Sequence, residues 1–241
     1  MDDFKIYSQE YRITSYDVDR NSNARLTSIL NYLQNSAWLH YSSYEKIKGK
    51  ILPENYGWLL SRIRIKIDAL PLWGDNIIVK TWSPGIGRMF ALRDFLVLDK
   101  KGIPVVKAST AWLIVDINKQ MPVRPDFFKD KWNFNREDPF IDTSKKINCS
   151  DKPDIKSTVK AAYSDIDVNE HVNNAKYVEW MIDCYESSFI NEHIPDYAEI
   201  DFTGQAVIDD SAEIGLKQIN GEGLTYFTNA VLSESKKNYA E

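Results

Sequence analysis

The chain has 241 residues, of which 43% are hydrophobic and 27% are charged, and its formal net charge at pH 7 is −5. This composition is typical of a globular protein long enough for two small domains, and it excludes collagen-like, low-complexity and largely disordered chains. The acidic balance argues against nucleic acid as a main partner. No apolar run reaches the ~20 residues of a membrane span, and the acidic start is unlike a signal or transit peptide. We therefore predict a cytoplasmic protein with no nucleic-acid and no membrane partner.

The cysteines and histidines limit the chemistry further. The two cysteines, Cys149 and Cys184, are too few for a disulfide scaffold or a cysteine-based metal site. The three histidines, His40, His171 and His193, are scattered and lack the spacing of metal ligands. Since no dinucleotide-binding loop is present either, we expect neither a metal nor a cofactor.

The first half of the chain predicts a strand, a long helix and four more strands. Loose alternation predicts a strand over residues 4–14, and capping residues at 21–23 precede a helix that begins near Ala24. The helix has one apolar face, formed by Leu26, Ile29, Leu30, Leu33, Ala37 and Tyr41. Residues with strand-like alternation follow at 58–67, 76–82, 89–98 and 105–117.

The same order of elements then restarts. Residues 133–150 have little periodicity and are predicted to be a linker that wraps over the surface. After the linker, the patterns predict a strand at 155–163, a helix at 174–190 and strands at 197–202, 212–219 and 225–232. The polar end of the chain, 236–241, stands where the first half has its fourth strand after the helix. The last strand is therefore expected to be short or absent.

Three pairs of segments support an internal duplication. They are 16–19 with 163–167, Asn23-Ala24-Arg25 with Asn174-Ala175-Lys176 at a separation of 151, and Gly74-Asp75 with Asp209-Asp210 at a separation of 135. A long helix wrapped by an antiparallel sheet is the hot-dog arrangement. We therefore predict an α+β protein of two tandem hot-dog repeats, residues 1–132 and 151–241.

The densest group of polar residues precedes the second helix. Residues 165–174 include two Asp, one Glu, one His and three Asn. A helix N-terminus offers unpaired N–H groups that can hold an oxyanion, so we expect the amides of 172–174 to do so during attack on a carbonyl. The alternative is that these residues only form caps and turns. His171 favours function, because capping needs no histidine and the matching stretch, Asp19 to Asn23, has none.

The segment 169–180 resembles the N-x-H-V-N-N-x-x-Y-x-x-W signature of the acyl-ACP thioesterases. Residues 30–38, Trp73-Gly74-Asp75, Thr81-Trp82 and Arg93-Asp94-Phe95 resemble the first half of that family. The resemblance implies a tandem hot-dog hydrolase of fatty acyl thioesters on acyl carrier protein (ACP), acting in fatty acid biosynthesis and lipid metabolism. It also implies an acyl-chain pocket in the first repeat and catalytic residues in the second.

By this motif, Asp167, Asn169 and His171 fall on the family's catalytic Asp, Asn and His. The family's catalytic Glu is replaced by Gln205, and the Cys that follows it in plant members is replaced by Ala206. A thiol nucleophile at this position is excluded, so we expect direct attack by a water that Asn169 and Gln205 hold. His171, oriented by a neighbouring side chain, would take the proton, and Asp167 would hold Asn169 or supply basicity. Gln205 belongs to the second copy alone, since its equivalent in the first is Leu70.

Other functions remain open beside this one. A hot-dog dehydratase is disfavoured because it needs an acid where Gln205 stands. An acyl-CoA thioesterase fits the same motif, and the change to Gln205 also fits a weakly active acyl-thioester-binding hot-dog protein. The sequence leaves open the preferred chain length and whether the protein is a homodimer.

One strand carries a basic stripe formed by Arg62, Arg64 and Lys66. Because acyl carrier protein is acidic, the stripe fits a docking surface for it. It fits a solvated outer sheet face equally well.

Overall fold

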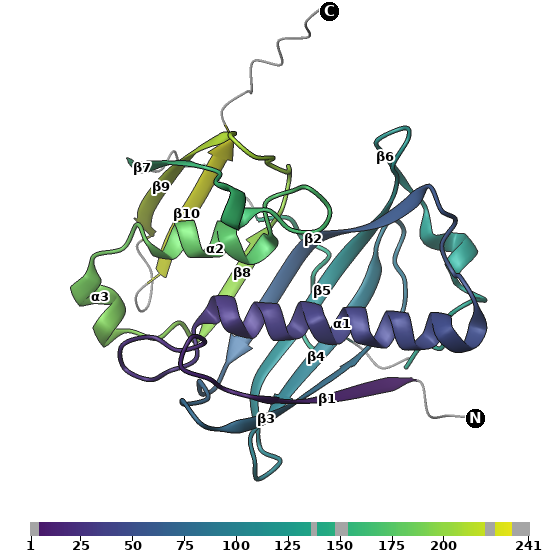
Figure 1. Ribbon diagram of the computed structural model, residues 1–241, viewed down its shortest axis with the longest axis horizontal. Helices are drawn as coiled ribbons and strands as arrows, with labels where there is room; N and C mark the ends of the chain where they lie inside the picture. The colour runs from purple at the N-terminus through teal and green to yellow at the C-terminus, as the bar shows by residue number, and fades with distance from the viewer. Residues whose placement is uncertain (1–4, 136–138, 148–153, 220–224, 233–241) are drawn as a thin grey trace, which may run out of the picture. The chain divides into compact units, whose positions relative to one another are not determined.

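The computed structural model describes residues 5–135, 139–147, 154–219 and 225–232 (Figure 1). It divides into a first unit, residues 1–147 with 195–202, and a second unit, residues 148–194 with 203–241. The division of the sequence into repeats at 132 and 151 stays a prediction. The polar end at 236–241, where the last strand was expected to be incomplete, lies outside the described residues.

The first unit is built on one antiparallel sheet. Its strands lie in the order β1 (Ile6–Arg12), β3 (Asn76–Trp82), β4 (Ala91–Leu98), β5 (Pro104–Asp116), β2 (Tyr56–Ile67) and β8 (Tyr197–Asp201). A short strand, β6 (Met121–Val123), pairs with β5 and leads into a 3₁₀ turn, η1 (Pro125–Phe128), which the sequence pattern does not predict. The strand β8 therefore adds to the free edge of β2, although it follows the second helix of the chain.

The helix α1 (Leu26–Lys48) lies across one face of this sheet (Figure 1). All six residues of its predicted apolar face are buried. The same face also buries polar groups, since Ser36 and His40 have no exposed surface. The helix ends at Gly49, whose positive φ of 82° places it in the left-handed region and whose N–H donates to the carbonyl of Glu45.

The second unit has a smaller sheet and a shorter helix. The strands β7 (Asp154–Lys160), β9 (Ser211–Ile219) and β10 (Thr225–Leu232) form an antiparallel sheet in the order β10-β9-β7. The helix α2 (Asn174–Ile182) packs on β9 and β10. Between β7 and α2 lies a 3₁₀ turn, η2 (Tyr163–Asp165).

The prediction of one helix over 174–190 is wrong. The helix α2 ends at Ile182, and a separate helix, α3 (Ser187–Glu192), follows. The N–H groups of Cys184 and Tyr185 donate to carbonyls three residues back, which tightens the last turn and ends the helix. The serines at 187 and 188 favour a helix start over a helix interior.

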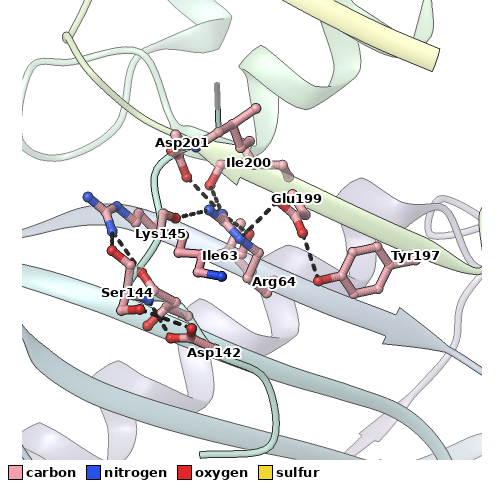
Figure 2. A network of polar contacts seen from close by, with 12 residues as sticks. Ile63, Arg64, Asp142, Ser144, Lys145, Tyr197, Glu199, Ile200 and Asp201 are labelled. Atoms are coloured by element: carbon pink, nitrogen blue, oxygen red, sulfur yellow. Dashed lines mark hydrogen bonds and ion pairs between the residues drawn. The ribbon is translucent and has the colours of Figure 1, made fainter. Parts of the chain in front are cut away.

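Neither interpretation of the basic stripe holds for Arg64, which is only 2% exposed. Its guanidinium forms an ion pair with Asp201 at 2.8 Å and another with Glu199 at 3.3 Å, both on β8 (Figure 2). It also donates to the carbonyl of Lys145 in the linker at 2.9 Å. Arg64 is thus a buried clamp that joins β2, β8 and the linker.

The linker continues along the same sheet. Arg62 donates to the carbonyls of Thr143 and Ser144, at 2.8 and 2.5 Å. The amide of Ile141 donates to Ser109 on β5. Lys66 is the exposed member of the stripe, with a side chain 59% accessible. Residues 139–147 therefore run across the strands. Backbone carbonyls of this segment accept hydrogen bonds from Arg62 and Arg64, two of the three basic side chains.

Candidate functional site

Three of the four candidate catalytic residues, Asp167, Asn169 and His171, lie in a tight loop of the second unit, residues 165–173. A β-bridge between Ile166 and Val172 closes the loop. Inside it, the N–H of Asp167 donates to the carbonyl of His171 at 2.8 Å, and the carboxylate of Asp167 accepts the N–H of Asn169 at 2.8 Å. Glu170 occupies the left-handed region, with φ of 63°, which lets the chain turn back.

The first unit contains the same loop at residues 17–25. There the bridge joins Val18 to Ala24, and the N–H of Asp19 donates to the carbonyl of Asn23 at 2.8 Å. The carboxylate of Asp19 accepts the N–H of Asn21 at 2.8 Å, and Ser22 has φ of 67°. Every one of these features has its counterpart 148 positions later. The pairing of 23–25 with 174–176 at a separation of 151 is therefore wrong, and Asn23 is the counterpart of His171.

A second pair of matching turns confirms the equivalence of Gly74-Asp75 and Asp209-Asp210. The N–H of Leu72 donates to the carboxylate of Asp75 at 3.0 Å, and the N–H of Val207 donates to that of Asp210 at 3.0 Å. Gly74 and Asp209 both have positive φ, 87° and 70°. This equivalence, 135 positions apart, makes Leu70 the counterpart of Gln205.

Comparison of the two loops distinguishes residues that form the turn in both units from residues that occur in the second unit alone. The Asp and Asn of the D-x-N motif occur in both loops, as Asp19 and Asn21 and as Asp167 and Asn169. In both loops the Asp carboxylate accepts the N–H of the Asn, and Asp19 also accepts the N–H of Asn23 at 2.9 Å. The motif therefore forms a turn in both units. His171 and Gln205 have no such equivalents, because the first repeat carries Asn23 and Leu70 there.

Within the described residues, the ring of His171 carries a buried nitrogen that lacks a hydrogen bond. Its ring is partly buried, and Nδ1 is buried with no hydrogen-bond partner in the part of the chain that the structure describes. We expected a neighbouring side chain to orient this ring, but in the described residues only the backbone carbonyl of His171 is held. Buried polar atoms without partners are uncommon in folded proteins and need an explanation, which a substrate or a water can supply.

The segment that carries Gln205 lies against this loop. The carbonyl of Ala206 accepts the N–H of Val172 at 2.8 Å, and the N–H of Ala206 donates to the hydroxyl of Tyr177 at 2.7 Å. We call these two hydrogen bonds the Ala206 brace. Ala206 is 1% exposed, whereas Gln205 beside it is exposed. Burial raises the pKa of the Tyr177 hydroxyl, so this group stays protonated at neutral pH.

Sequence reasoning gave Tyr177 no role, although it is the Tyr of the N-x-H-V-N-N-x-x-Y-x-x-W signature. On the predicted helix it was only one more aromatic residue. Its partner is a backbone amide 29 positions away, and a contact of that kind leaves no pattern in a single sequence. The position of the tyrosine within the signature was the available signal.

The expectation that the amides of 172–174 bind an oxyanion is wrong for the first two. The N–H of Val172 donates to Ala206, and that of Asn173 donates to the carbonyl of Asp165 at 2.9 Å. Two residues after Asn173, the N–H of Ala175 donates to the side chain of Asn173, which caps α2. The amides of Val172 and Asn173 are thus engaged within the protein, whereas Asn169 and Gln205 are exposed residues whose side-chain amides can donate to a ligand.

The first unit holds a pocket between α1 and the sheet. Its volume is about 600 Å³, including the open mouth. Its walls are mainly aromatic and aliphatic: Gln34, Ala37, Trp38, Tyr41, Trp58, Ser83, Ala91, Leu92, Arg93, Trp112, Phe128 and Trp132. Size and lining fit an elongated apolar group.

Among the described residues, no group of three or more His, Cys, Asp or Glu side chains is arranged to hold a metal ion. No helix in the described part of the chain is long and apolar enough to span a membrane.

Two family models match the chain in succession. The N-terminal domain of the acyl-ACP thioesterases matches residues 4–129, and their C-terminal domain matches residues 149–240. Among curated relatives, a chloroplastic palmitoyl-acyl carrier protein thioesterase of Arabidopsis thaliana is 27% identical over 74% of this chain and 47% of its own. A dodecanoyl-[acyl-carrier-protein] hydrolase of Cinnamomum camphora is 25% identical over 85% of this chain and 57% of its own. The chain thus spans about half the length of the curated relatives it matches.

Solved structures show the same fold. An acyl-ACP thioesterase from Bacteroides thetaiotaomicron has a TM-score of 0.78 and 24% identity, with 97% of this chain and 100% of that chain covered. The 12:0-ACP thioesterase of Umbellularia californica has a TM-score of 0.78 and 21% identity, with 94% and 88% covered. These likenesses confirm the predicted α+β class with tandem hot-dog repeats. With both family models matched in order along its length, the chain belongs to the acyl-ACP thioesterase family.

Proposed function

We propose that the protein hydrolyses fatty acyl-ACP thioesters to a free fatty acid and ACP, by direct water attack at a site in the second repeat. One observation carries this function. Both thioesterase domains match in order over residues 4–129 and 149–240, and the loop with the family's His and Asn lies in the second. The names of the relatives, hydrolases of acyl groups on acyl carrier protein, support this substrate class.

The roles follow from what the two loops share. Asp167 holds the turn through the amide of Asn169, as Asp19 holds its equivalent, so we assign it a positioning role. His171 acts as the general base, because histidine is the side chain that most often accepts and returns a proton in catalysis. The side-chain amides of Asn169 and Gln205 hold the attacking water and donate to the thioester carbonyl oxygen. No backbone donor from 172 or 173 is needed.

A covalent thiol mechanism has no nucleophile at this site. Position 206 is an alanine with 1% of its surface exposed. Cys184 lies on the turn after α2, where its Sγ is 3.4 Å from both the hydroxyl of Ser157 and the carbonyl of Trp180. Cys149 lies outside the described residues. Water is therefore the proposed nucleophile, and the thiol of the carrier leaves directly.

We further propose that the pocket of the first unit takes the acyl chain, with the repeats divided as 1–132 and 151–241 around a linker at 133–150. The aromatic lining of the pocket supports its assignment as the acyl-chain site. Arg62 and Arg64 are engaged by the linker and β8, so ACP docking is not assigned to their stripe. A cytoplasmic location, a role in fatty acid biosynthesis and a homodimeric state are kept as proposals of the same account.

The change to Gln205 favours a second candidate, a weakly active protein that binds acyl thioesters, and CoA remains an alternative carrier. One experiment separates these functions. Release of free thiol and fatty acid is measured with acyl-ACP and acyl-CoA of matched chain lengths, for the wild type, Gln205→Glu and Gln205→Ala. Leu70→Ala, at the counterpart position, is the control. The proposal is supported if the wild type turns over acyl-ACP faster than acyl-CoA, if Gln205→Ala loses this turnover, and if the control Leu70→Ala keeps it. Binding without turnover in every variant would contradict it.

A further inference from the structure

Among the described residues that line the pocket of the first unit, Arg93 is the one charged side chain. Arg93, on β4, lines the pocket among aromatic side chains, and its Cζ lies 5.7 Å from the ring centroid of Trp132. Burial lowers the pKa of its guanidinium to about 10, so the group remains protonated at neutral pH. A positive charge in a pocket suited to an apolar chain requires a reason.

Among the residues that the structure describes, the hydrogen-bond partners of Arg93 do not neutralise this charge. One nitrogen, Nη1, makes both of its hydrogen bonds in the described residues, to Nδ1 of His40 at 3.0 Å and to Oγ1 of Thr81 at 3.2 Å. Both partners are neutral acceptors: Thr81 uses its own hydrogen on the carbonyl of Asp94, and a donor from Arg93 requires the unprotonated Nδ1 of His40.

The nearest carboxylate in sequence is committed elsewhere. Asp94 accepts from the hydroxyl of Ser109 at 2.6 Å and from the amide of Phe140 at 3.3 Å. In the described part of the chain, no carboxylate forms an ion pair with Arg93, and its Nε and Nη2 make no hydrogen bond there. A guanidinium has five N–H donors in a planar fork, so within the described residues the edge formed by Nε and Nη2 keeps its donors for a ligand, and Arg93 is part of the pocket wall.

A charge placed this way penalises a purely hydrocarbon occupant. An alkyl chain would displace water from the guanidinium and offer it no acceptor, and the loss of such a hydrogen bond to a charged group is costly. An oxygen acceptor on the chain would replace that water, and a carboxylate could do so through two parallel bonds. The rest of the wall, with Trp38, Trp112 and Phe128, still suits methylene groups.

We propose that this pocket prefers an acyl chain that carries an oxygen acceptor (a hydroxyl, carbonyl or carboxylate), which the unpaired edge of Arg93 binds. The inference rests on the proposed function for the pocket's role as the acyl site. It makes Arg93 a specificity-determining residue, distinct from the catalytic loop of the second unit.

The test measures binding without turnover. Four of the chain's seven tryptophans, at 38, 58, 112 and 132, line the pocket, so intrinsic fluorescence reports its occupancy. The probes are unreactive amide analogues of acyl thioesters, from hexanoyl to hexadecanoyl, either saturated or with an oxygen acceptor at the β-carbon, at mid-chain or at the ω-carbon. Wild type is compared with Arg93→Met and with the control Arg88→Met, which makes the same substitution at an exposed arginine outside the described pocket lining.

At least one oxygenated analogue should bind the wild type about tenfold or more tightly than the saturated analogue of equal length, the range expected for a hydrogen bond to a charged group. The preference should persist in Arg88→Met and vanish in Arg93→Met. Equal or tighter binding of the saturated analogues at every length by the wild type would overturn the proposal, whether or not the variant folds. So would an unchanged preference in folded Arg93→Met. If saturated acyl-ACP is hydrolysed but no preference is found, this inference fails and the thioesterase function stands.

Discussion

The hydroxyl of Tyr177 is predicted to hold the Gln205 segment in place. It accepts the amide of Ala206 at 2.7 Å, and Ala206 is 1% exposed. In Tyr177→Phe the ring still packs, but the amide is left buried without a partner. Such a loss costs about 1–3 kcal/mol of the free energy of unfolding. Because the other half of the Ala206 brace reaches Val172, next to His171, we also expect kcat for acyl-ACP to fall.

Urea unfolding and steady-state hydrolysis check both parts. The control is Tyr163→Phe, in the same unit, whose side chain is 86% exposed and whose substitution should change neither quantity. If the unfolding free energy of Tyr177→Phe stayed within about 0.5 kcal/mol of wild type, the size expected of a neutral surface change, the brace would have no energetic weight. If stability fell and kcat did not, the segment would be structural only.

Three further predictions concern the framework of the two repeats. Arg64→Met should lower the free energy of unfolding by about 3–5 kcal/mol, because it leaves Asp201 buried without its ion-pair partner, while exposed Lys66→Met should change it by less than about 0.5 kcal/mol; equal effects would refute the clamp. Asp167→Ala should cost about 1 kcal/mol, and Asp19→Ala should cost more, since the carboxylate of Asp19 accepts the N–H of Asn23 in addition to the shared contact. A loss of stability in one loop alone, measured by urea unfolding, would contradict the equivalence. Glu170→Val should cost about 1–2 kcal/mol and Glu170→Gly much less, because position 170 has positive φ; thermal or urea unfolding of both variants checks this, and equal stability would argue against the left-handed turn.

The helices and strands were largely predictable because their patterns are local. The apolar face from Leu26 to Tyr41 is an i, i+3, i+4 stripe, and the structure buries all of it. The break after Ile182 was missed because the residues that follow it, Asp183 to Glu186, contain neither Gly nor Pro. It depends on hydrogen bonds around Cys184 that periodicity does not report.

Contacts between residues far apart in the sequence account for the remaining differences between the predictions and the structure. The alternation of Arg62, Arg64 and Lys66 correctly indicated a strand face, but nothing local shows that β8 and the linker cover it. The candidate site shows the same limit. Its motif was visible in the sequence, whereas the occupied amides of Val172 and Asn173 depend on Ala206 and Asp165. The wrong separation of 151 arose because Asn-Ala occurs both at Asn23 and at Asn174, while backbone geometry pairs Asn23 with His171.

The most direct test of the proposed function compares His171 with its counterpart in the first repeat. Asn23 and His171 occupy the same place in equivalent loops, and both are partly buried. Hydrolysis of acyl-ACP is measured for His171→Ala and Asn23→Ala, with unfolding curves for both. We predict that His171→Ala lowers kcat by about 10²–10⁴, the contribution of a general base, while Asn23→Ala leaves it near wild type. Full activity of folded His171→Ala, or an equal loss in both variants, would contradict the assignment of the catalytic site.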